Sequence, residues 1–277
     1  MDIRFNILDP YIDQFIVCES LFTHSGKSKK INFNIDEYPK FKDKITHIVL
    51  EKHPENLIKK PNLNTEEKRL NSIYRIKAQR NYISKFLDKF SPDDYIIYSD
   101  NDEIPNLEKF DFKLNSKKFV IFNQKIFYYK FNLTLPELNW FGSKACKLKH
   151  LNTIDNLRNI KNRQYSYLRF DTLFSAYKQN SVNIVKNGGW HFSNLKTSQS
   201  LEKKYLNDEN HAEYELQNNS HEKIRDNIVR QVIPYNYNAK KNSSNRFEET
   251  KLTKINTDDL PVYIKKNINK YKDWIVA

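Results

Sequence analysis

Two carboxylates directly follow a short apolar run in the middle of the chain. Residues 95–98 are Tyr-Ile-Ile-Tyr, which predicts a buried strand, and the acidic segment Ser99-Asp100-Asn101-Asp102-Glu103 comes next. An Asp-x-Asp at the end of such a strand places two carboxylates on one turn, where both can reach one hard divalent cation, although acidic triplets are also common on surfaces. Mg²⁺ or Mn²⁺ held in this way shares its ligands with substrate phosphates and stabilises charge on a leaving diphosphate. The spacing therefore predicts a metal site formed by Asp100 and Asp102.

The elements that must position these carboxylates alternate between strand-like and helix-like patterns. Strands are expected at residues 13–19, 45–50, 95–98, 119–122, 126–131 and 182–185. Helices are expected at residues 2–9, 66–90, 167–178, 198–207 and 220–232. This alternation predicts an α/β fold with a layered sheet and with ligands at the C-terminal ends of its strands.

Length and composition indicate a globular protein without a nucleotide-binding glycine loop. The 277 residues suit one large domain, or one domain with a small appendage, and 14% of them are aromatic. The four glycines stand at positions 26, 142, 188 and 189. No Rossmann fingerprint and no P-loop can be drawn through those positions, so both kinds of site are excluded.

The chain carries a formal net charge of +13, which is compatible with several kinds of partner. Such a balance suits nucleic acid, an anionic membrane surface or a phosphate-bearing substrate. The basic residues are spread along the chain without a long run, and Lys- and Asn-rich usage is also what an AT-rich genome produces. Charge alone therefore does not select a partner.

Cysteine usage and the N-terminus predict a soluble cytoplasmic protein. Cys18 and Cys146 form neither a metal pair nor a disulfide framework, so a reducing compartment is the default expectation. The first residues contain no apolar signal region, and no window approaches the length and hydrophobicity of a membrane span. We expect no signal peptide and no membrane anchor, and the sequence leaves the oligomeric state open.

Five ordered motifs resemble glycosyltransferase family 17, which includes the β-1,4-mannosyl-glycoprotein 4-β-N-acetylglucosaminyltransferases. Ser99–Pro105 resembles the family's Ser-Asp-x-Asp-Glu-Ile-Pro signature, and all four glycines fall inside the motifs. The other stretches that carry the resemblance are residues 4–8 with 17–20 and 23–29, residues 79–81, residues 140–143 and residues 188–193; a His-x-Glu at 211–213 is similar to that of non-animal members. The resemblance covers roughly residues 2–230.

The resemblance implies a GT-A-type nucleotide-sugar-binding fold with a mixed central sheet flanked by helices. It also implies a UDP-sugar donor such as UDP-GlcNAc, a glycan acceptor, an inverting transfer and a divalent cation, Mn²⁺ or Mg²⁺, on Asp100 and Asp102. Glu103 is then expected to orient the metal loop or contact the sugar. His191 is a third metal ligand, a phosphate-binding group or a hydrogen-bonded structural histidine.

Further roles follow from the same resemblance. Arg80 and Lys203 are candidates to neutralise the diphosphate, with a helix salt bridge as the alternative for Arg80. Inversion needs a carboxylate to take the proton of the acceptor hydroxyl, and Asp171 and Glu213 are the candidates, each with a structural role as the alternative. Trp140 and Trp190 either stack on a sugar face or pack in the core.

The sequence departs from the family pattern at its start and leaves other functions open. Members begin with a strand upstream of the helix expected here at residues 2–9, so we expect an unfilled sheet position beside the strand at residues 14–19, and weaker donor binding. The expected glycosyltransferase domain spans residues 1–235, followed by a polar extension over 236–277 whose part up to 258 is expected to be mobile. The alternatives are a metal-dependent protein that binds nucleic acid or processes phosphodiesters, which we do not favour, and a catalytically inactive sugar-binding module.

Overall fold

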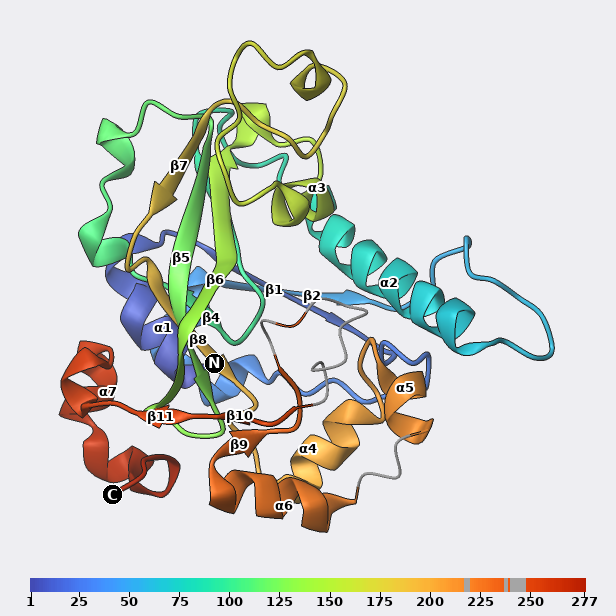
Figure 1. Cartoon of the computed structure of the whole chain (residues 1–277). Coiled ribbons are helices and arrows are strands. Elements are labelled where there is room, and N and C mark those ends of the chain that lie inside the picture. The colour runs from blue at the N-terminus through green and yellow to red at the C-terminus, as the bar shows by residue number, and fades with distance from the viewer. Residues whose placement is uncertain (217–219, 237–238, 240–247) are drawn as a thin grey trace. The chain divides into compact units, whose positions relative to one another are not determined.

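The chain divides into two compact units. The computed structural model describes residues 1–216, 220–236, 239 and 248–277 (Figure 1). Unit 1 comprises Met1–Tyr11, Lys89–Leu195 and Asn227–Ala277, and unit 2 comprises Ile12–Asp88 and Lys196–Asp226. None of the described helices has the length and apolar character needed to cross a membrane.

Unit 2 is built on two parallel strands and one long helix. β1 (Phe15–Ser20) pairs in parallel with β2 (Ile45–Leu50), from Phe15 opposite Ile45 to Ser20 opposite Leu50. The other elements are α2 (Thr65–Tyr82), α4 (Ser198–Tyr205), α5 (His211–Leu216) and α6 (His221–Arg230), which crosses the boundary of the units. Two short 3₁₀ helices, Ile35–Glu37 and Pro39–Lys44, precede β2, and a third, Ile83–Phe86, follows α2.

Helix α2 is fixed at both of its ends. At its start, Asn64 and Glu67 form a capping box in which each side chain accepts a hydrogen bond from the other residue's backbone N–H. Near its end, Gln79 donates a hydrogen bond to the carbonyl of Cys18 at 2.9 Å and accepts one from the Ser20 hydroxyl at 3.2 Å. Gln79 therefore fastens α2 to β1.

A seven-stranded mixed sheet forms the centre of unit 1 (Figure 1). Its strands are β3 (Tyr95–Tyr98), β4 (Glu103–Pro105), β5 (Phe119–Tyr128), β6 (Leu133–Lys147), β7 (Val182–Val185), β8 (Gly189–Ser193) and β11 (Thr253–Lys254). Central β5 pairs antiparallel with β6 and parallel with β7 and β8. β4 pairs antiparallel with β8, while β3 and β11 pair antiparallel with β6.

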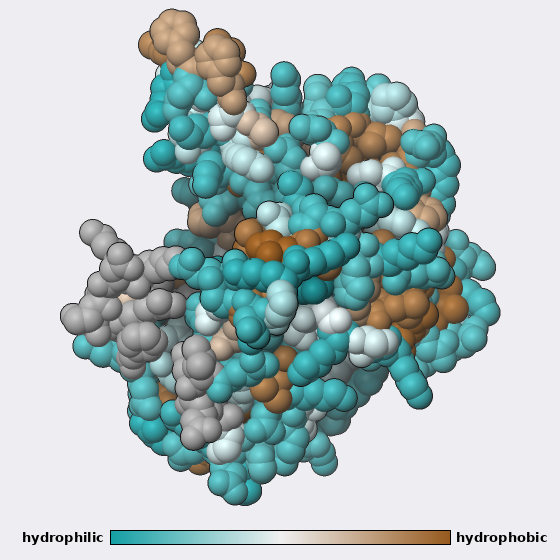
Figure 2. All heavy atoms as spheres, turned by 90° about the vertical axis from the view of Figure 1, so that its right-hand side faces the viewer, coloured by the Kyte–Doolittle hydropathy of each residue, from teal (hydrophilic) through white to brown (hydrophobic). Residues whose placement is uncertain are grey.

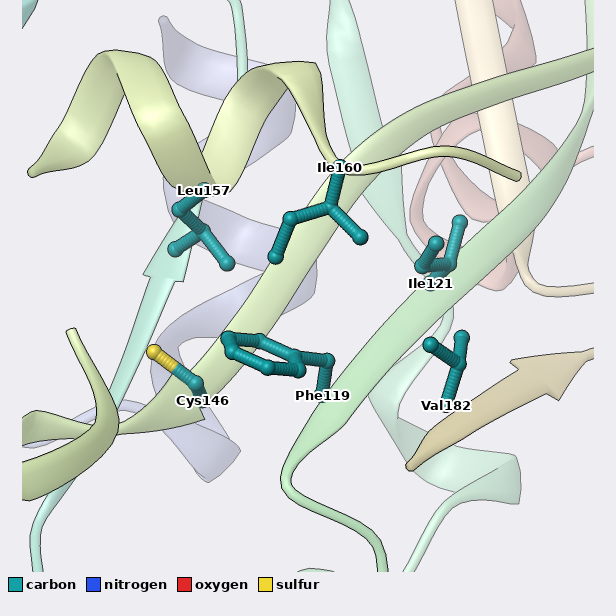
Figure 3. Packing of buried hydrophobic residues seen from close by; sticks show 6 residues of the cluster. All are labelled: Phe119, Ile121, Cys146, Leu157, Ile160 and Val182. Carbon is teal, nitrogen blue, oxygen red and sulfur yellow. The ribbon is translucent and has the colours of Figure 1, made fainter. Parts of the chain in front are cut away.

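Helix α3 (Ile154–Asn159) covers part of this sheet and closes a buried apolar cluster. Leu157 of α3 and the following Ile160 pack with residues of β5, β6 and β7, as Figure 3 shows. The strand residues of the cluster are Phe119, Ile121, Cys146 and Val182. All six side chains are at most 7% exposed, so this packing fixes the position of α3 on the sheet.

The described C-terminal residues belong to unit 1 and pack on its N-terminal helix. α7 (Val262–Lys266) contacts α1 (Asp2–Leu8), and the 3₁₀ helix Ile268–Trp274 follows it. β9 (Val232–Ile233) and β10 (Thr250–Lys251) form a separate antiparallel pair. The boundary predicted at residue 235 stays a prediction, although residues 248–277 share the core of unit 1 through buried Leu252, Leu260 and Ile264.

Many expected elements are present with small changes of length. The ranges 45–50, 95–98 and 182–185 are strands as predicted, and residues 2–8 form the expected helix. The predicted helix 66–90 is too long, because α2 ends at Tyr82 and the next turn tightens to 3₁₀. The strands expected at 119–122 and 126–131 are one strand, β5. Of the segment 236–258, residues 237, 238 and 240–247 lie outside the described residues, and the part after them contains the short strands β10 (Thr250–Lys251) and β11 (Thr253–Lys254).

One expected helix is wrong. Residues 167–178 form a loop that contains a single 3₁₀ turn, Phe170–Thr172. The apolar residues there follow helical spacing, but their side chains are exposed, so no buried face stabilises a helix of that length.

Candidate active site

The Asp-x-Asp segment forms the turn between β3 and β4. The Glu103 N–H donates to the carbonyl of Asp100 at 3.1 Å and closes this turn. β4 then pairs antiparallel with β8, so that Glu103 lies directly opposite His191. The short β4 therefore brings two of the predicted motifs together, although they are far apart in the sequence.

Glu103 is fully buried, and its carboxylate accepts hydrogen bonds from three directions. Oε1 accepts from Trp140 Nε1 at 2.7 Å and from Arg158 Nη2 at 3.0 Å, and Oε2 accepts from the Asp100 N–H at 3.0 Å. Burial raises the pKa of Glu103 and the charge of Asp100 adds to the rise, whereas Arg158 opposes it. In this position Glu103 orients the turn and the indole rather than facing solvent.

Gly142 provides the space that Glu103 occupies. A Cβ on Gly142 would lie 2.6 Å from Oε1 of Glu103 and 2.5 Å from Oε1 of Gln124, closer than side chains tolerate. The next residue, Ser143, accepts a hydrogen bond from Gln124 at 3.0 Å and one from the Ser99 hydroxyl at 2.7 Å. Residues 140–143 of β6 thus form one wall around the buried carboxylate.

Both carboxylate oxygens of Asp100 are bound by neighbouring side chains. The Tyr98 hydroxyl donates to Oδ1 at 2.8 Å, and Arg158 donates to Oδ2 from Nε at 3.2 Å and from Nη2 at 2.9 Å. Arg4, on α1, donates to the backbone carbonyls of Asp100 and Glu103. Burial lowers the pKa of Arg4, and the nearby carboxylates oppose that shift. The side chains of two arginines therefore hold the turn. Arg158 binds the Asp100 carboxylate, and Arg4 binds backbone carbonyls of the turn.

Asp102 lies beside His191 on the more exposed side of the cluster. Asp102 Oδ2 is 3.4 Å from His191 Nε2, and the Asp102 side chain is 29% exposed. The imidazole stacks on the Trp140 ring with a centroid separation of 4.4 Å. His191 Nδ1 is buried and has no hydrogen-bond partner within the described part of the chain. His191 and Asp102 therefore lie side by side, and the role of His191 as a metal ligand stays a prediction.

These residues fit a divalent cation in part. Three carboxylates and two guanidinium groups leave the cluster with one net negative charge when all five are ionised and His191 is neutral. Asp102 supplies a carboxylate oxygen of the kind that Mn²⁺ and Mg²⁺ prefer, and the nitrogen of His191 lies beside it as a second donor, better suited to Mn²⁺ than to Mg²⁺. Asp100 is already bound by Arg158 and Tyr98, and no group of three or more His, Cys, Asp or Glu side chains within the described ranges could hold a metal ion.

The whole chain, including this cluster, matches one known protein family. The family model described as glycosyltransferase family 17 matches residues 1–275. The chain belongs to glycosyltransferase family 17. A search of curated proteins gives no significant match, and neither does a search of solved structures. Membership implies that the protein is a glycosyltransferase, with a sugar donor and an acceptor as its substrates.

Two other candidate residues of this glycosyltransferase lie elsewhere in unit 1. Trp190 follows Gly189 on β8, so its side chain points to the opposite face of the sheet from His191, and its Nε1 donates to the carbonyl of Asp259 at 3.1 Å. Asp171 lies in the loop after α3 and binds Arg169 and Lys178 through hydrogen bonds of 2.7–2.9 Å. These two partners hold the pKa of Asp171 well below its usual range.

Three candidates of the glycosyltransferase belong to unit 2. Arg80 is half-buried in the last turn of α2, Lys203 is exposed on α4, and Glu213 is half-buried in the first turn of α5. Their roles at a donor or acceptor stay predictions. The structure thus joins Asp100, Asp102, Glu103, Trp140 and His191 in one cluster of unit 1, whereas Trp190 and Asp171 of the same unit have other partners.

The sequence analysis did not predict that Arg158 and Arg4 bind the Asp-x-Asp turn. Arg4 belongs to a motif that resembles the family, so a signal was present, but its partners are backbone carbonyls that no side-chain pattern reveals. Arg158 lies on α3 outside every motif, and only the packing of Leu157 and Ile160 on the sheet directs it to Asp100.

Proposed function

We propose that this family 17 protein is an inverting glycosyltransferase with a GT-A-type fold that transfers GlcNAc from UDP-GlcNAc to a glycan acceptor, with the help of a divalent cation. The observation that carries the proposal is the convergence of three motifs on one cluster. Asp102 and Glu103 come from the Asp-x-Asp segment, Trp140 from β6 and His191 from β8, and each contacts at least one of the others.

The charge of the cluster supports the use of a cation. UDP is anionic, and with its five charged groups ionised and His191 neutral the cluster carries one net negative charge, so a diphosphate gains little by direct approach. We propose that Asp102 and His191 hold the cation together with diphosphate oxygens, and that Arg158 and Tyr98 keep Asp100 in position beside them. When bound, such a cation stabilises the charge that develops on the departing UDP.

We propose that Trp140 supports Glu103 and His191 and does not itself stack on a sugar. Its Nε1 is used by Glu103 and one face of its ring is covered by His191, so its indole fixes the imidazole that faces Asp102. Trp190 is half-buried beside the exposed Lys125 and lies on the opposite face of the sheet from His191, so a sugar that stacked on Trp190 would lie away from the proposed cation.

The group that accepts the proton of the acceptor hydroxyl is proposed to be Glu213 rather than Asp171. A general base works best with a pKa near the operating pH, and the low pKa of Asp171 in its double ion pair makes it a weak base. Glu103 has its carboxylate filled by three donors and is better suited to orient the turn.

A panel of UDP-sugars tests this function. We expect UDP release from UDP-GlcNAc in the presence of Mn²⁺, little release from UDP-glucose or UDP-galactose, and loss of release with a chelator. Glu213→Gln should lower transfer, whereas Asp88→Asn, which changes an exposed aspartate, should not. If the protein binds UDP-sugars without releasing UDP under any condition, it is an inactive sugar-binding module and the proposal is wrong.

A further inference from the structure

The loop that follows α3 exposes an unusual number of large apolar side chains. Tyr167, Leu168, Phe170, Leu173 and Phe174 are 67%, 88%, 81%, 74% and 92% exposed. They lie within eight consecutive residues between α3 and β7, in the loop at the top of Figure 1, and Figure 2 shows hydrophobic residues projecting at the top of the molecule. Contiguous exposed apolar surface of this kind marks an interaction site.

The loop is a defined structure with closed ends. The Lys161 N–H donates to the carbonyl of Tyr177 at 2.9 Å, and the Tyr165 N–H donates to the carbonyl of Gln179 at 2.9 Å. Buried Tyr165 anchors this base, and the amide of Asn156 on α3 binds the carbonyl of Ala176 at 3.0 Å. The apolar residues are therefore presented by a closed loop of unit 1.

Positive charge surrounds the base of this loop. Arg163 and Arg169 lie over the Tyr165 ring at 4.5 Å and 5.4 Å from its centroid. Lys161 and Lys178 stand on the two limbs of the loop, next to the hydrogen bonds that close it. Asp171 is the one acidic residue between 161 and 178, and Arg169 and Lys178 bind it, so four cations face one compensated carboxylate.

We propose that this loop docks the protein on an anionic lipid surface. Aromatic and leucine side chains at the tip enter the boundary between headgroups and acyl chains, while the arginines and lysines at the base bind lipid phosphates. The whole chain carries +13, which adds long-range attraction to such a surface. This function goes beyond sugar transfer and does not depend on it.

A lipid surface fits the loop better than a protein partner. Each of the tip residues is at least two-thirds exposed, whereas a protein interface with a well-packed centre needs a matching concave partner. A fluid bilayer adapts to the shape of inserted side chains, and its negative charge attracts the excess of positive charge in the loop, where Asp171 is the one carboxylate beside four cations.

Vesicle co-sedimentation of the full chain tests the proposal. Vesicles of phosphatidylglycerol mixed with phosphatidylcholine should pull down the protein at low salt, and pure phosphatidylcholine should do so much less. The double variant Phe170→Ser/Phe174→Ser should weaken the partition by about tenfold or more, because it removes two inserting side chains. The double variant Lys161→Gln/Arg163→Gln should weaken binding to the anionic vesicles. It should also make the remaining binding less sensitive to salt, because two of the cations that attract lipid phosphates are removed.

Matched controls separate insertion from general effects. Leu114→Ser and Lys113→Gln change exposed residues of another segment and should leave vesicle binding unchanged. Phe174→Trp should give fluorescence that brominated lipids quench, and Leu114→Trp should not. Equal melting temperatures of the variants exclude unfolding as the cause, since all the changed side chains are exposed.

Three results would overturn the proposal. The first is wild-type protein that binds anionic vesicles no better than neutral ones. The second is full binding by the Phe170→Ser/Phe174→Ser variant. The third is a dimer in sedimentation velocity that this variant abolishes while vesicle binding is absent, which would assign the loop to contacts between copies of the chain.

Discussion

Arg158 holds Asp100 through two hydrogen bonds to a single carboxylate oxygen, from Nε at 3.2 Å and from Nη2 at 2.9 Å. The same Nη2 lies 3.0 Å from Oε1 of Glu103, so one guanidinium joins the first and last carboxylates of the Asp-x-Asp-Glu segment. This arrangement leaves Asp102 as the carboxylate of the segment that faces His191.

Replacing Arg158 by Lys should impair catalysis more than folding. Lysine keeps the charge but cannot make the forked contact with Asp100 and Glu103. We expect kcat/KM for sugar transfer to fall by about 10–100-fold and more Mn²⁺ to be needed for half-maximal activity, as for residues that orient a metal site. Arg225→Lys, on the exposed face of α6, is the matched control. An unchanged Mn²⁺ requirement in Arg158→Lys would show that Arg158 does not position the site.

Gly142→Ala should destabilise unit 1. The added methyl would meet the carboxylate of Glu103 and the amide of Gln124, which have no room to move away from their other hydrogen bonds. Overpacking of this kind costs about 1–3 kcal/mol, which thermal unfolding can measure. Glu137→Ala, at an exposed position of the same strand, should melt like the wild type. Equal melting of both variants would mean that the wall around Glu103 is not tightly packed.

Asp2 should make stability depend on acid pH. Burial raises the pKa of Asp2, but hydrogen bonds from Lys270, Tyr271 and Tyr263 outweigh that effect and hold it below 3.8. A lowered pKa in the folded state means that the stabilisation is complete above the unfolded value and is lost as pH falls through the folded one. Asp2→Asn should therefore melt a few degrees below the wild type at neutral pH.

The same difference should shrink as the pH falls below 3.8, because the wild-type carboxyl then becomes protonated and loses its ion pair with Lys270. Differential scanning calorimetry of both proteins across this range measures the effect, and Asp43→Asn is an exposed control. A gap in melting temperature that stays constant at every pH would exclude an electrostatic role for Asp2.

Local patterns in the sequence were sufficient for those parts of the fold and site that depend on neighbouring residues. The strand Tyr95–Tyr98 and the turn at Asp100–Asp102 follow from a short apolar run and the acidic residues after it. The placement of Glu103 opposite His191 depends on strand pairing, which periodicity does not predict; the resemblance offered His191 only as one possible ligand of the metal on Asp100 and Asp102. Strand β6 was missed because its residues 133–147 mix charged, polar and apolar types along a partly exposed strand.

The position of Arg158 and the conformation of the loop at 167–178 depend on long-range packing, which the sequence did not reveal. Arg158 reaches Asp100 only because Leu157 and Ile160 dock α3 on β5 and β6. The loop at 167–178 has the apolar spacing of a helix, but the decisive factor was the absence of a surface on which to bury Phe170 and Phe174, both of which are exposed. Spacing predicts a helix only where tertiary structure supplies a partner.

Calorimetric titration of UDP with and without Mn²⁺ tests the central claim most directly. The account predicts Mn²⁺-dependent UDP binding by the wild type and its loss in Asp102→Asn, with the melting temperature of the variant within a few degrees of the wild type. Asp88→Asn should bind like the wild type. UDP affinity in Asp102→Asn equal to that of the wild type would contradict the assignment of the Asp102–His191 pair to the donor site.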